Sequence, residues 1–381
     1  MKIIKTKGVE IKSWCENPEE GALEQARHLA ELPFIHQWVA LMPDTHQGYG
    51  MPIGGVLPTK DVIIPNAVGV DIGCGMCAVK TSLTELDKEV LKKIMGTIRE
   101  TVPVGFKMHE QNQGLEILLD HTDVITPLLE KAGKQVGTLG GGNHFIEIQK
   151  GSDGFIWIMI HSGSRNLGKT VADHYNKLAI ELNKKWWSLI PEEWELAFLP
   201  VDSQEGKDYI KDMNYCIDFA FKNRRLMLDN IQKAFTDNLE VSFEKEINIA
   251  HNYARIEHHM GKDVWVHRKG ATSARLDEIG IIPGSQGTKS YIVKGKGNIM
   301  SFQSCSHGSG RRMGRKQAER ELNLEEEVKR LNDLGVIHSI RGLKELDEAP
   351  GAYKDIQVVM SEQTDLVDIV VELSPLAVIK G

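Results

Sequence analysis

The sequence predicts a mixed α/β (α+β) fold with central β-sheets. Short apolar segments rich in β-branched residues alternate with segments in which apolar residues recur at helical spacing. This alternation runs through all 381 residues without a break in composition, a repeat or a low-complexity linker. At about 150 residues per domain, two or three domains would be permitted. The continuity favours a single domain over residues 1–381, with a helical lobe at about 170–239.

The individual elements follow from these patterns. Short apolar runs bounded by Gly, Pro or polar residues are typical of buried strands, and they occur at residues 38–42, 62–64, 156–160, 264–266, 291–293 and 369–371. The pattern Thr84-x-x-Asp87 predicts the start of a helix that runs to about Arg99. Apolar residues at helical spacing predict further helices over residues 115–131, 169–185, 206–235 and 316–334.

Composition excludes several classes of protein. With 41% hydrophobic and 26% charged residues the chain is not disordered, and no apolar run approaches the ~18 residues of a membrane span. The N-terminus lacks the pattern of a signal peptide, and five scattered cysteines do not suggest a disulfide framework. A reducing cytoplasm is therefore the expected location. The net charge of −7 means that any polyanion must be met by a local basic patch.

Glycines gather in six polar blocks, most of them close to an apolar strand. Glycine permits positive φ and close approach to a ligand, and loops at strand ends are where α/β proteins build sites. A single block would be read as a tight turn. Six blocks, most of which carry Asp, His or Cys, favour one composite site. The blocks lie at residues 42–50, 70–75, 137–144, 161–165, 282–287 and 305–311.

Five residues in or near these blocks are candidate metal ligands: Asp71, Cys74, His144, His161 and His251, the last in a stretch of helical character. Thiolate, imidazole and carboxylate donors together suit Mn, Fe, Co or Zn rather than Ca or Mg. A thiolate can also bridge two ions, so the set would serve a two-metal site about 4 Å across.

Two other motifs compete with this interpretation. Residues 163–170 match G-x-x-x-x-G-K-T, between an apolar run and a helical pattern, which is the context of a P-loop NTPase. A P-loop enzyme, however, has no use for His161 or for the Cys, His and Asp residues. Cys74 and Cys77 have zinc-knuckle spacing, but no second cysteine pair completes a four-sulfur site.

Taken together, the blocks closely resemble the RtcB family of GTP-dependent RNA ligases, as a shorter, divergent bacterial-type member. The resemblance covers nearly the whole chain, and its motifs occur in the family's order. They lie at residues 42–46, 68–75, 140–147, 160–165, 251–253, 268–271, 282–287, 304–308, 352–356 and 380–381.

The resemblance implies that the chain joins an RNA 3′-phosphate or 2′,3′-cyclic phosphate end to a 5′-hydroxyl end, in RNA repair or tRNA splicing. It implies GTP as co-substrate and two Mn²⁺ ions, and it leaves open whether an activating protein partner takes part. His307 corresponds to the histidine that carries GMP, and Asp44 to an acidic residue beside it. One manganese would be held by Cys74, His161 and His251, and the other by Asp71, Cys74 and His144.

Further roles follow from the same resemblance. The nucleotide contacts would be Asn143, Glu147, Ser285, Ser290, Ser309, Tyr353 and Lys380. The RNA-contact candidates lie inside or beside matched motifs, and they are Arg165, Arg268, Lys269, Arg311 and Arg312. Cys305 is the alternative nucleophile by residue type, but a phosphoramidate requires a histidine.

Overall fold

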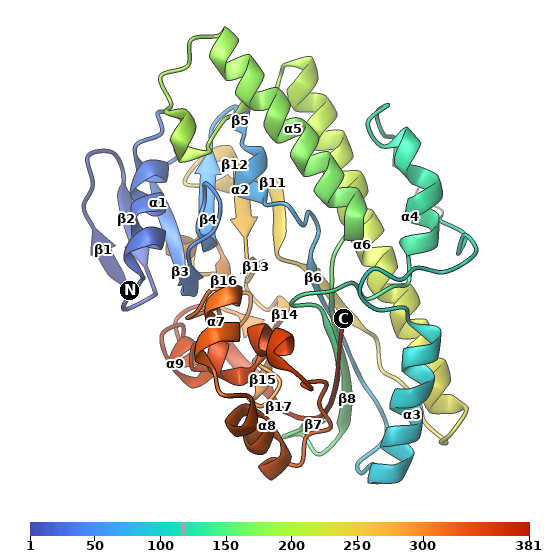
Figure 1. Ribbon diagram of the computed structural model, residues 1–381. Helices are drawn as coiled ribbons and strands as arrows, with labels where there is room; N and C mark the ends of the chain where they lie inside the picture. Colours follow the sequence, from blue (N-terminus) through green and yellow to red (C-terminus); the bar gives the residue numbers. More distant parts are fainter. Residues whose placement is uncertain (116–118) are drawn as a thin grey trace.

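The computed structural model describes residues 1–115 and 119–381. It confirms a mixed α/β fold, in which two large sheets are flanked by helices (Figure 1). The first sheet has six strands, in the spatial order β1 (Lys2–Ile4), β2 (Glu10–Ser13), β3 (Trp38–His46), β4 (Ile53–Thr59), β12 (Lys262–Lys269) and β11 (Asn252–His259). Only the β2–β3 pair of this sheet is parallel.

The second sheet has seven strands and is antiparallel throughout. Its spatial order is β10 (Ile247–Ala250), β6 (Gly75–Lys80), β8 (Ile156–Ser162), β7 (Phe145–Gly151), β17 (Val367–Lys380), β15 (Ser290–Gly295) and β14 (Ile279–Ile282). The two edge strands, β10 and β14, approach each other, so the sheet curls toward closure. Two short ribbons pair β13 (Ala271–Ser273) with β16 (Ser304–Ser306), and β5 (Val62–Ile63) with β9 (Leu199–Pro200).

Helices cover the outer faces of the sheets. Their bounds are α1 (Glu20–Ala30), α2 (Pro65–Val68), α3 (Lys88–Thr101), α4 (Leu129–Gln135), α5 (Arg165–Lys185), α6 (Gln204–Thr236), α7 (Arg315–Glu321), α8 (Leu324–Asp333) and α9 (Ile356–Ser361). Apolar residues of α3 and α6 pack on β6, β7 and β8 in one core cluster, and α1 packs on β3 and β4 in another. No helix in the described part of the chain combines the length and apolar character needed to cross a bilayer.

A third cluster joins the two sheets. Met42 of β3 and Val266 of β12 share it with Ile282 of β14 and Tyr291 of β15. Because apolar side chains of both sheets are buried together here, the ends of their strands are held in fixed relation. The candidate site lies at this junction.

Several sequence expectations need correction. Residues 115–131 were expected to form one helix. Residues 116–118 fall outside the described part of the chain, residues 119–125 are not helical, and helix begins only with the 3₁₀ turn Thr126–Leu128 and α4. The expected helix over 316–334 is two helices, because the Asn323 side chain accepts hydrogen bonds from the backbone N–H groups of Glu325 and Glu326 and starts α8 anew.

The long helices α5 and α6 match their predicted ranges closely and pack against each other (Figure 1). Their shared core also contains Val68 and Ile72, from the segment that carries Cys74. The pair is therefore tied to the site through apolar packing, and a separate lobe at residues 170–239 stays a prediction.

Candidate active site

Four strand ends of the seven-stranded sheet carry predicted metal ligands. Cys74 precedes β6, His144 precedes β7, His161 lies near the end of β8, and His251 follows β10. Neighbouring strands here run antiparallel, so the starts of β6 and β7 lie at the same edge of the sheet as the ends of β8 and β10. The topology thus brings together four residues that are spread over 178 positions of the chain (251 − 74 + 1).

His251 lies in the break between β10 and β11, and not in the helix that the sequence suggested. Its backbone N–H donates to the carbonyl of Cys74 (2.8 Å). The next residue, Asn252, donates from its side chain to the carbonyl of Asp71 (3.1 Å). These bonds fasten the β10–β11 connection to the loop that carries the thiol.

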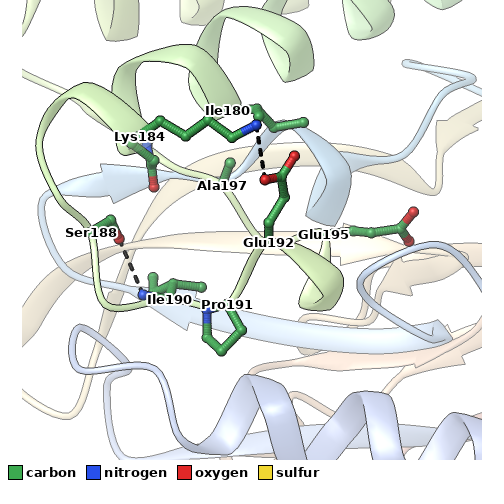
Figure 2. Close-up of a pocket in the computed structure, with 9 residues that line it drawn as sticks. Ile180, Lys184, Ser188, Ile190, Pro191, Glu192, Glu195 and Ala197 are labelled. Atoms are coloured by element: carbon green, nitrogen blue, oxygen red, sulfur yellow. Dashed lines mark hydrogen bonds and ion pairs between the residues drawn. The ribbon is translucent and has the colours of Figure 1, made fainter.

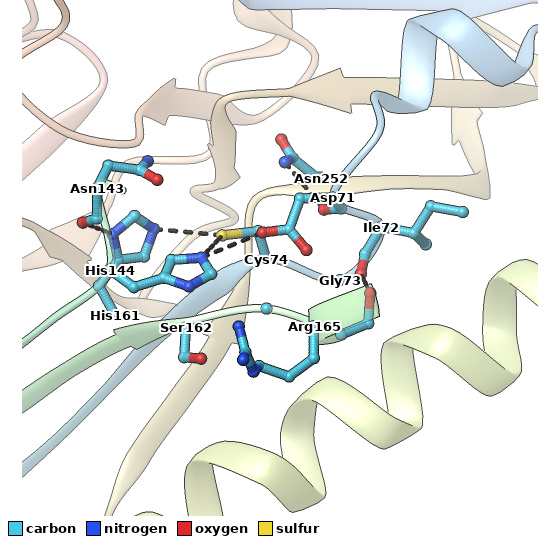
Figure 3. A network of polar contacts seen from close by, with 12 residues as sticks. Asp71, Ile72, Gly73, Cys74, Asn143, His144, His161, Ser162, Arg165 and Asn252 are labelled. Atoms are coloured by element: carbon cyan, nitrogen blue, oxygen red, sulfur yellow. Dashed lines mark hydrogen bonds and ion pairs between the residues drawn. The ribbon is translucent and has the colours of Figure 1, made fainter. Parts of the chain in front are cut away.

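The ligand atoms of Asp71, Cys74, His144 and His161 converge (Figure 3). Cys74 Sγ lies 3.3 Å from His161 Nε2 and 3.6 Å from His144 Nε2. His161 Nε2 is 3.4 Å from His251 Nε2, and His144 Nε2 is 3.1 Å from Asp71 Oδ2. The donor atoms of Cys74, His144 and His161 all lie within 4.8 Å of one another, and the three residues are buried.

The hydrogen bonds around this cluster decide which nitrogens face it. Nδ1 of His144 lies 3.0 Å from the carbonyl oxygen of Leu139, and Nδ1 of His161 lies 3.0 Å from that of Asn143. A carbonyl can only accept, so each Nδ1 donates its N–H outward and each Nε2 presents a lone pair inward. Lone pairs this close together require a cation or protons between them.

Other features also fit a bound transition-metal ion. Asp71 Oδ1 is buried and has no hydrogen-bond partner in the described part of the chain. Burial raises the pKa of the Cys74 thiol, and the Asp71 charge raises it further, so the thiolate that a metal binds would need a cation beside it. Burial also lowers the pKa of His161 and of His251, which keeps their rings neutral. A cation would favour the thiolate, and neutral imidazole is the form that binds metals.

His307 stands beside this cluster, directly after β16. Its ring centroid is 4.9 Å from that of His251. Asp44 Oδ2 accepts from His307 Nδ1 (2.6 Å), from the backbone N–H of His307 (3.0 Å) and from that of Gly308 (3.2 Å). Burial by itself would raise the pKa of Asp44, but the hydrogen bond from His307, and the positive charge of that ring whenever it is protonated, outweigh burial and lower the pKa. An ionised Asp44 therefore holds Nδ1–H and leaves Nε2 free.

A cavity of about 260 Å³ opens next to His307. Six of the seven predicted nucleotide contacts line it, namely Asn143, Glu147, Ser285, Ser309, Tyr353 and Lys380. Ser290 does not line it. Its side chain is completely buried and accepts from Gln149 (3.1 Å) and from the backbone N–H of Gly284 (3.1 Å), so it supports the wall from behind.

Two buried carboxyl groups of the cavity differ in charge. Burial raises the pKa of Glu147 to about 8, although Lys380 opposes this shift. Burial would also raise the pKa of Glu348, but Lys380, Arg311 and Arg315 outweigh it and lower that pKa to about 2. At neutral pH Glu147 is thus mainly protonated and Glu348 ionised.

Sequence reasoning missed Glu348. Its Oε2 accepts from Lys380 Nζ (2.8 Å) and from the Tyr353 hydroxyl, so it orients two of the predicted nucleotide contacts. It lies in the 3₁₀ segment Leu343–Glu348 and matches no short motif. The only sequence feature that could have indicated Glu348 is its position a few residues before Tyr353, a predicted nucleotide contact.

The RNA-contact candidates separate into different environments. Arg268 is completely buried, and its guanidinium bonds Glu257, Ser304 and the carbonyl of Phe302, so it is not placed to meet RNA. Lys269 is also buried and donates to backbone carbonyls, and burial lowers its pKa to about 7.

The other three candidates are more accessible. Arg165 is half-buried and donates to Thr138 Oγ1 and to the carbonyl of Gly105 (both 2.9 Å). Arg311 is ion-paired with Glu348 at the cavity. Arg312 is exposed, and its Nε donates to the carbonyl of Gly351 (2.8 Å).

The competing motifs lose their structural basis. The Gly163–Thr170 pattern does not form a loop, because α5 begins at Arg165, and Lys169 is an exposed helical residue that pairs with Asp173 (2.5 Å). Cys77 packs in the core below the sheet, and Cys305 is completely buried, with burial raising the pKa of its thiol.

A second cavity, of about 240 Å³, lies between the end of α5 and the segment that follows it (Figure 2). An ion pair between Lys184 and Glu192 (2.9 Å) crosses it. None of the predicted site residues lines this cavity.

Comparison with known proteins agrees with the geometry of the site. A family profile described as tRNA-splicing ligase RtcB matches residues 25–126 and 117–381. The RNA-splicing ligase RtcB of Escherichia coli K12 is 37% identical over 412 aligned positions, which include all of this chain and 99% of that protein. The tRNA-splicing ligase RtcB of Thermococcus kodakarensis is 31% identical, over 95% of this chain and 92% of its own length.

Proposed function

This chain belongs to the RtcB family of RNA-splicing ligases, and from that premise we propose that it joins RNA 3′-phosphate or 2′,3′-cyclic phosphate ends to 5′-hydroxyl ends. GTP is the co-substrate, and a GMP group carried on His307 is the intermediate. The physiological setting is RNA repair or tRNA splicing in the cytoplasm. One observation carries the proposal: an imidazole oriented by a buried carboxylate adjoins both a cluster of metal donors and a cavity lined by the predicted nucleotide contacts.

Two Mn²⁺ ions fit the donor set. Cys74, His161 and His251 would hold one ion, and Asp71, Cys74 and His144 the other, with the thiolate shared. When bound, the ions would neutralise phosphate charge and orient the phosphates for in-line attack.

His307 performs the first step. Asp44 accepts the Nδ1–H, so the Nε2 lone pair is free to attack the α-phosphorus of GTP. A phosphorus–nitrogen bond forms, the bond to the bridging oxygen breaks, and pyrophosphate leaves. The positive charge that develops on the ring is stabilised by the Asp44 carboxylate, whose other donors are backbone N–H groups.

The cavity holds the nucleotide. Protonated Glu147 and ionised Glu348 offer hydrogen-bonding groups to the guanine edge, and Tyr353 offers an aromatic face. Arg311 and Arg315 line the same cavity, where both pair with Glu348 and keep it ionised.

The remaining steps use the RNA. A cyclic end is first opened by water to a 3′-phosphate. An oxygen of that phosphate attacks the phosphorus of the His307–GMP group, which frees Nε2 and forms a pyrophosphate link between RNA and GMP. The 5′-hydroxyl of the second strand then attacks the RNA phosphorus, a phosphodiester forms, and GMP leaves.

The test is covalent labelling. With Mn²⁺ and [α-³²P]GTP, the protein should acquire a label that is lost in hot acid and kept in alkali, as a phosphorus–nitrogen bond requires. Addition of RNA with 3′-phosphate and 5′-hydroxyl ends should discharge the label and yield joined RNA.

Two variants make this test specific. His307→Ala should abolish labelling, whereas Cys305→Ala, which removes a buried thiol two positions away, should retain it. Labelling of His307→Ala, or a label on the wild type that survives hot acid but not alkali, would refute the assignment.

A further inference from the structure

Two adjacent polar residues in the middle of α6, Asn223 and Arg224, are completely buried. Neither touches a predicted ligand atom or the nucleotide cavity, so the proposed mechanism leaves them without a role. Burying a guanidinium is costly unless its donors are satisfied. Nε and Nη1 of Arg224 have partners, and the groups that they bond show what these residues do.

Arg224 joins the backbones that flank three ligands. Its Nη1 donates to the carbonyls of Gly73 and Ser162, both at 2.9 Å. Gly73 immediately precedes Cys74, and Ser162 immediately follows His161. Its Nε donates to Asn248 Oδ1 (2.7 Å), on the strand that leads three residues later to His251.

Asn223 extends the same network toward His144. Its Oδ1 accepts from the backbone N–H groups of Gly137 (2.8 Å) and Thr138 (3.1 Å). Its Nδ2 donates to the Ser162 hydroxyl (3.1 Å), which in turn donates to the carbonyl of Leu139 (2.8 Å). That carbonyl also accepts the Nδ1–H of His144 (3.0 Å).

The electrostatics of Arg224 lead to the same centre. Within the described part of the chain, Nε and Nη1 of Arg224 donate to an amide oxygen and two backbone carbonyls rather than to a carboxylate, and Nη2 has no hydrogen-bond partner. Burial lowers the pKa of Arg224 to about 10, so the group is still charged at neutral pH, and the nearby Asp71 carboxylate favours its charged form.

We propose that Asn223 and Arg224 are positioning residues for the metal centre. They hold the Cys74 loop, the His144 loop, the end of β8 and the start of the β10–β11 connection at fixed spacing. The donor atoms are thereby arranged before an ion binds. This inference rests on the proposed function, because it assumes that the donor cluster binds Mn²⁺.

The test measures Mn²⁺ affinity without nucleotide or RNA. Arg224→Met keeps the length of the side chain but removes charge and donors, Arg224→Lys keeps the charge but loses the planar fork, and Asn223→Ser shortens the amide. The readouts are direct Mn²⁺ titration and the rise in melting temperature that Mn²⁺ produces. Each variant should bind Mn²⁺ about 10- to 100-fold more weakly, with Arg224→Lys the least affected.

A matched control lies on the same helix. Asp212 is also completely buried, and it bonds Thr122 and Tyr175 rather than the ligand loops. Asp212→Asn should lower the melting temperature of the metal-free protein yet keep wild-type Mn²⁺ affinity. A merely structural role for Arg224 would give the same result as this control.

The outcomes separate the two claims. Wild-type Mn²⁺ affinity in folded Arg224→Met overturns the positioning role. If Arg224→Met does not fold, wild-type affinity in both Arg224→Lys and Asn223→Ser overturns it instead. Absence of any Mn²⁺ response in the wild-type protein overturns the metal centre, and this inference with it.

Discussion

At the scale of single residues, the chemistry depends on which imidazole nitrogen carries the proton. His144, His161 and His307 each donate Nδ1–H to an oxygen, which belongs to Leu139, Asn143 and Asp44 respectively. In all three rings this leaves Nε2 as the free nitrogen. Two of these nitrogens face the donor cluster, and the third belongs to the nucleophile.

The role of Asp44 leads to the first prediction. Asp44→Asn keeps the size of the side chain but removes the charge that stabilises the ring as Nε2 attacks. Single-turnover labelling by GTP should slow by about 100-fold or more, as for other oriented acid–base groups. Mn²⁺ affinity should be unchanged. Labelling at the wild-type rate would show that Asp44 does not orient the nucleophile.

Glu147 gives a prediction about pH. Its folded-state pKa, about 8, lies above the ordinary value of 4.5, so the folded protein binds this proton more tightly than the unfolded chain. The stability from this group is therefore complete below about pH 4.5 and is lost as pH rises toward 8.

The measurement is chemical unfolding of the nucleotide-free protein between pH 5 and 9. The free energy of unfolding of the wild type should fall relative to that of Glu147→Gln across this range. Parallel pH profiles for the two proteins would contradict a neutral, buried Glu147.

At this scale the sequence shows residue types but not their surroundings. Asp71, Cys74, His144, His161 and His251 could be chosen because their types suit one kind of metal. The carbonyls that fix the tautomers could not be chosen, since any residue supplies one. Glu348 could not be chosen either, because its partners Lys380 and Arg311 are distant from it in the sequence.

At the scale of elements, the site is made by strand ends in register. Antiparallel pairing of β10, β6, β8 and β7 places the first residues of two strands beside the last residues of the other two. A short apolar run predicted β8, but none predicted β10, β6 or β7, and the spatial order of the four depends on long-range pairing that local patterns do not encode. The sequence around His251 predicts helical character, whereas the structure has a short connection between β10 and β11 there.

Whether residues 163–170 form a P-loop also depends on which element they lie in. The second glycine of this motif, Gly168, and its lysine, Lys169, lie within α5, where the backbone N–H groups are used by the helix. Lys169→Ala should therefore change neither GTP labelling nor RNA joining by more than about twofold, since exposed surface substitutions usually have small effects. Loss of both activities, comparable to that of His307→Ala, would restore the P-loop alternative.

At the scale of the whole molecule, a chain of net charge −7 must attract RNA through local cations. The mixed α/β class was predictable from the alternation of segments. The burial of Arg268 was not, because its partner Glu257 lies across a strand pair that the sequence did not reveal. Charge near a motif is thus weaker evidence for RNA contact than exposure.

Arg312 remains the exposed candidate, and it gives a prediction about salt. Arg312→Ala should raise the KM for RNA and reduce the slope of log affinity against log salt by about 1. Labelling by GTP without RNA should be unchanged. Lys177→Ala, which removes an exposed cation on α5, is the control and should leave the slope intact. Equal slopes for Arg312→Ala and the wild type would remove Arg312 from the RNA path.

The most direct measurement of the account as a whole is a crystal structure of the protein after incubation with Mn²⁺ and GTP, with data collected at the manganese absorption edge. The account predicts anomalous density bonded to Cys74 Sγ and continuous density from His307 Nε2 to the phosphorus of GMP. Manganese away from Cys74, or GMP attached to any other residue, would contradict it.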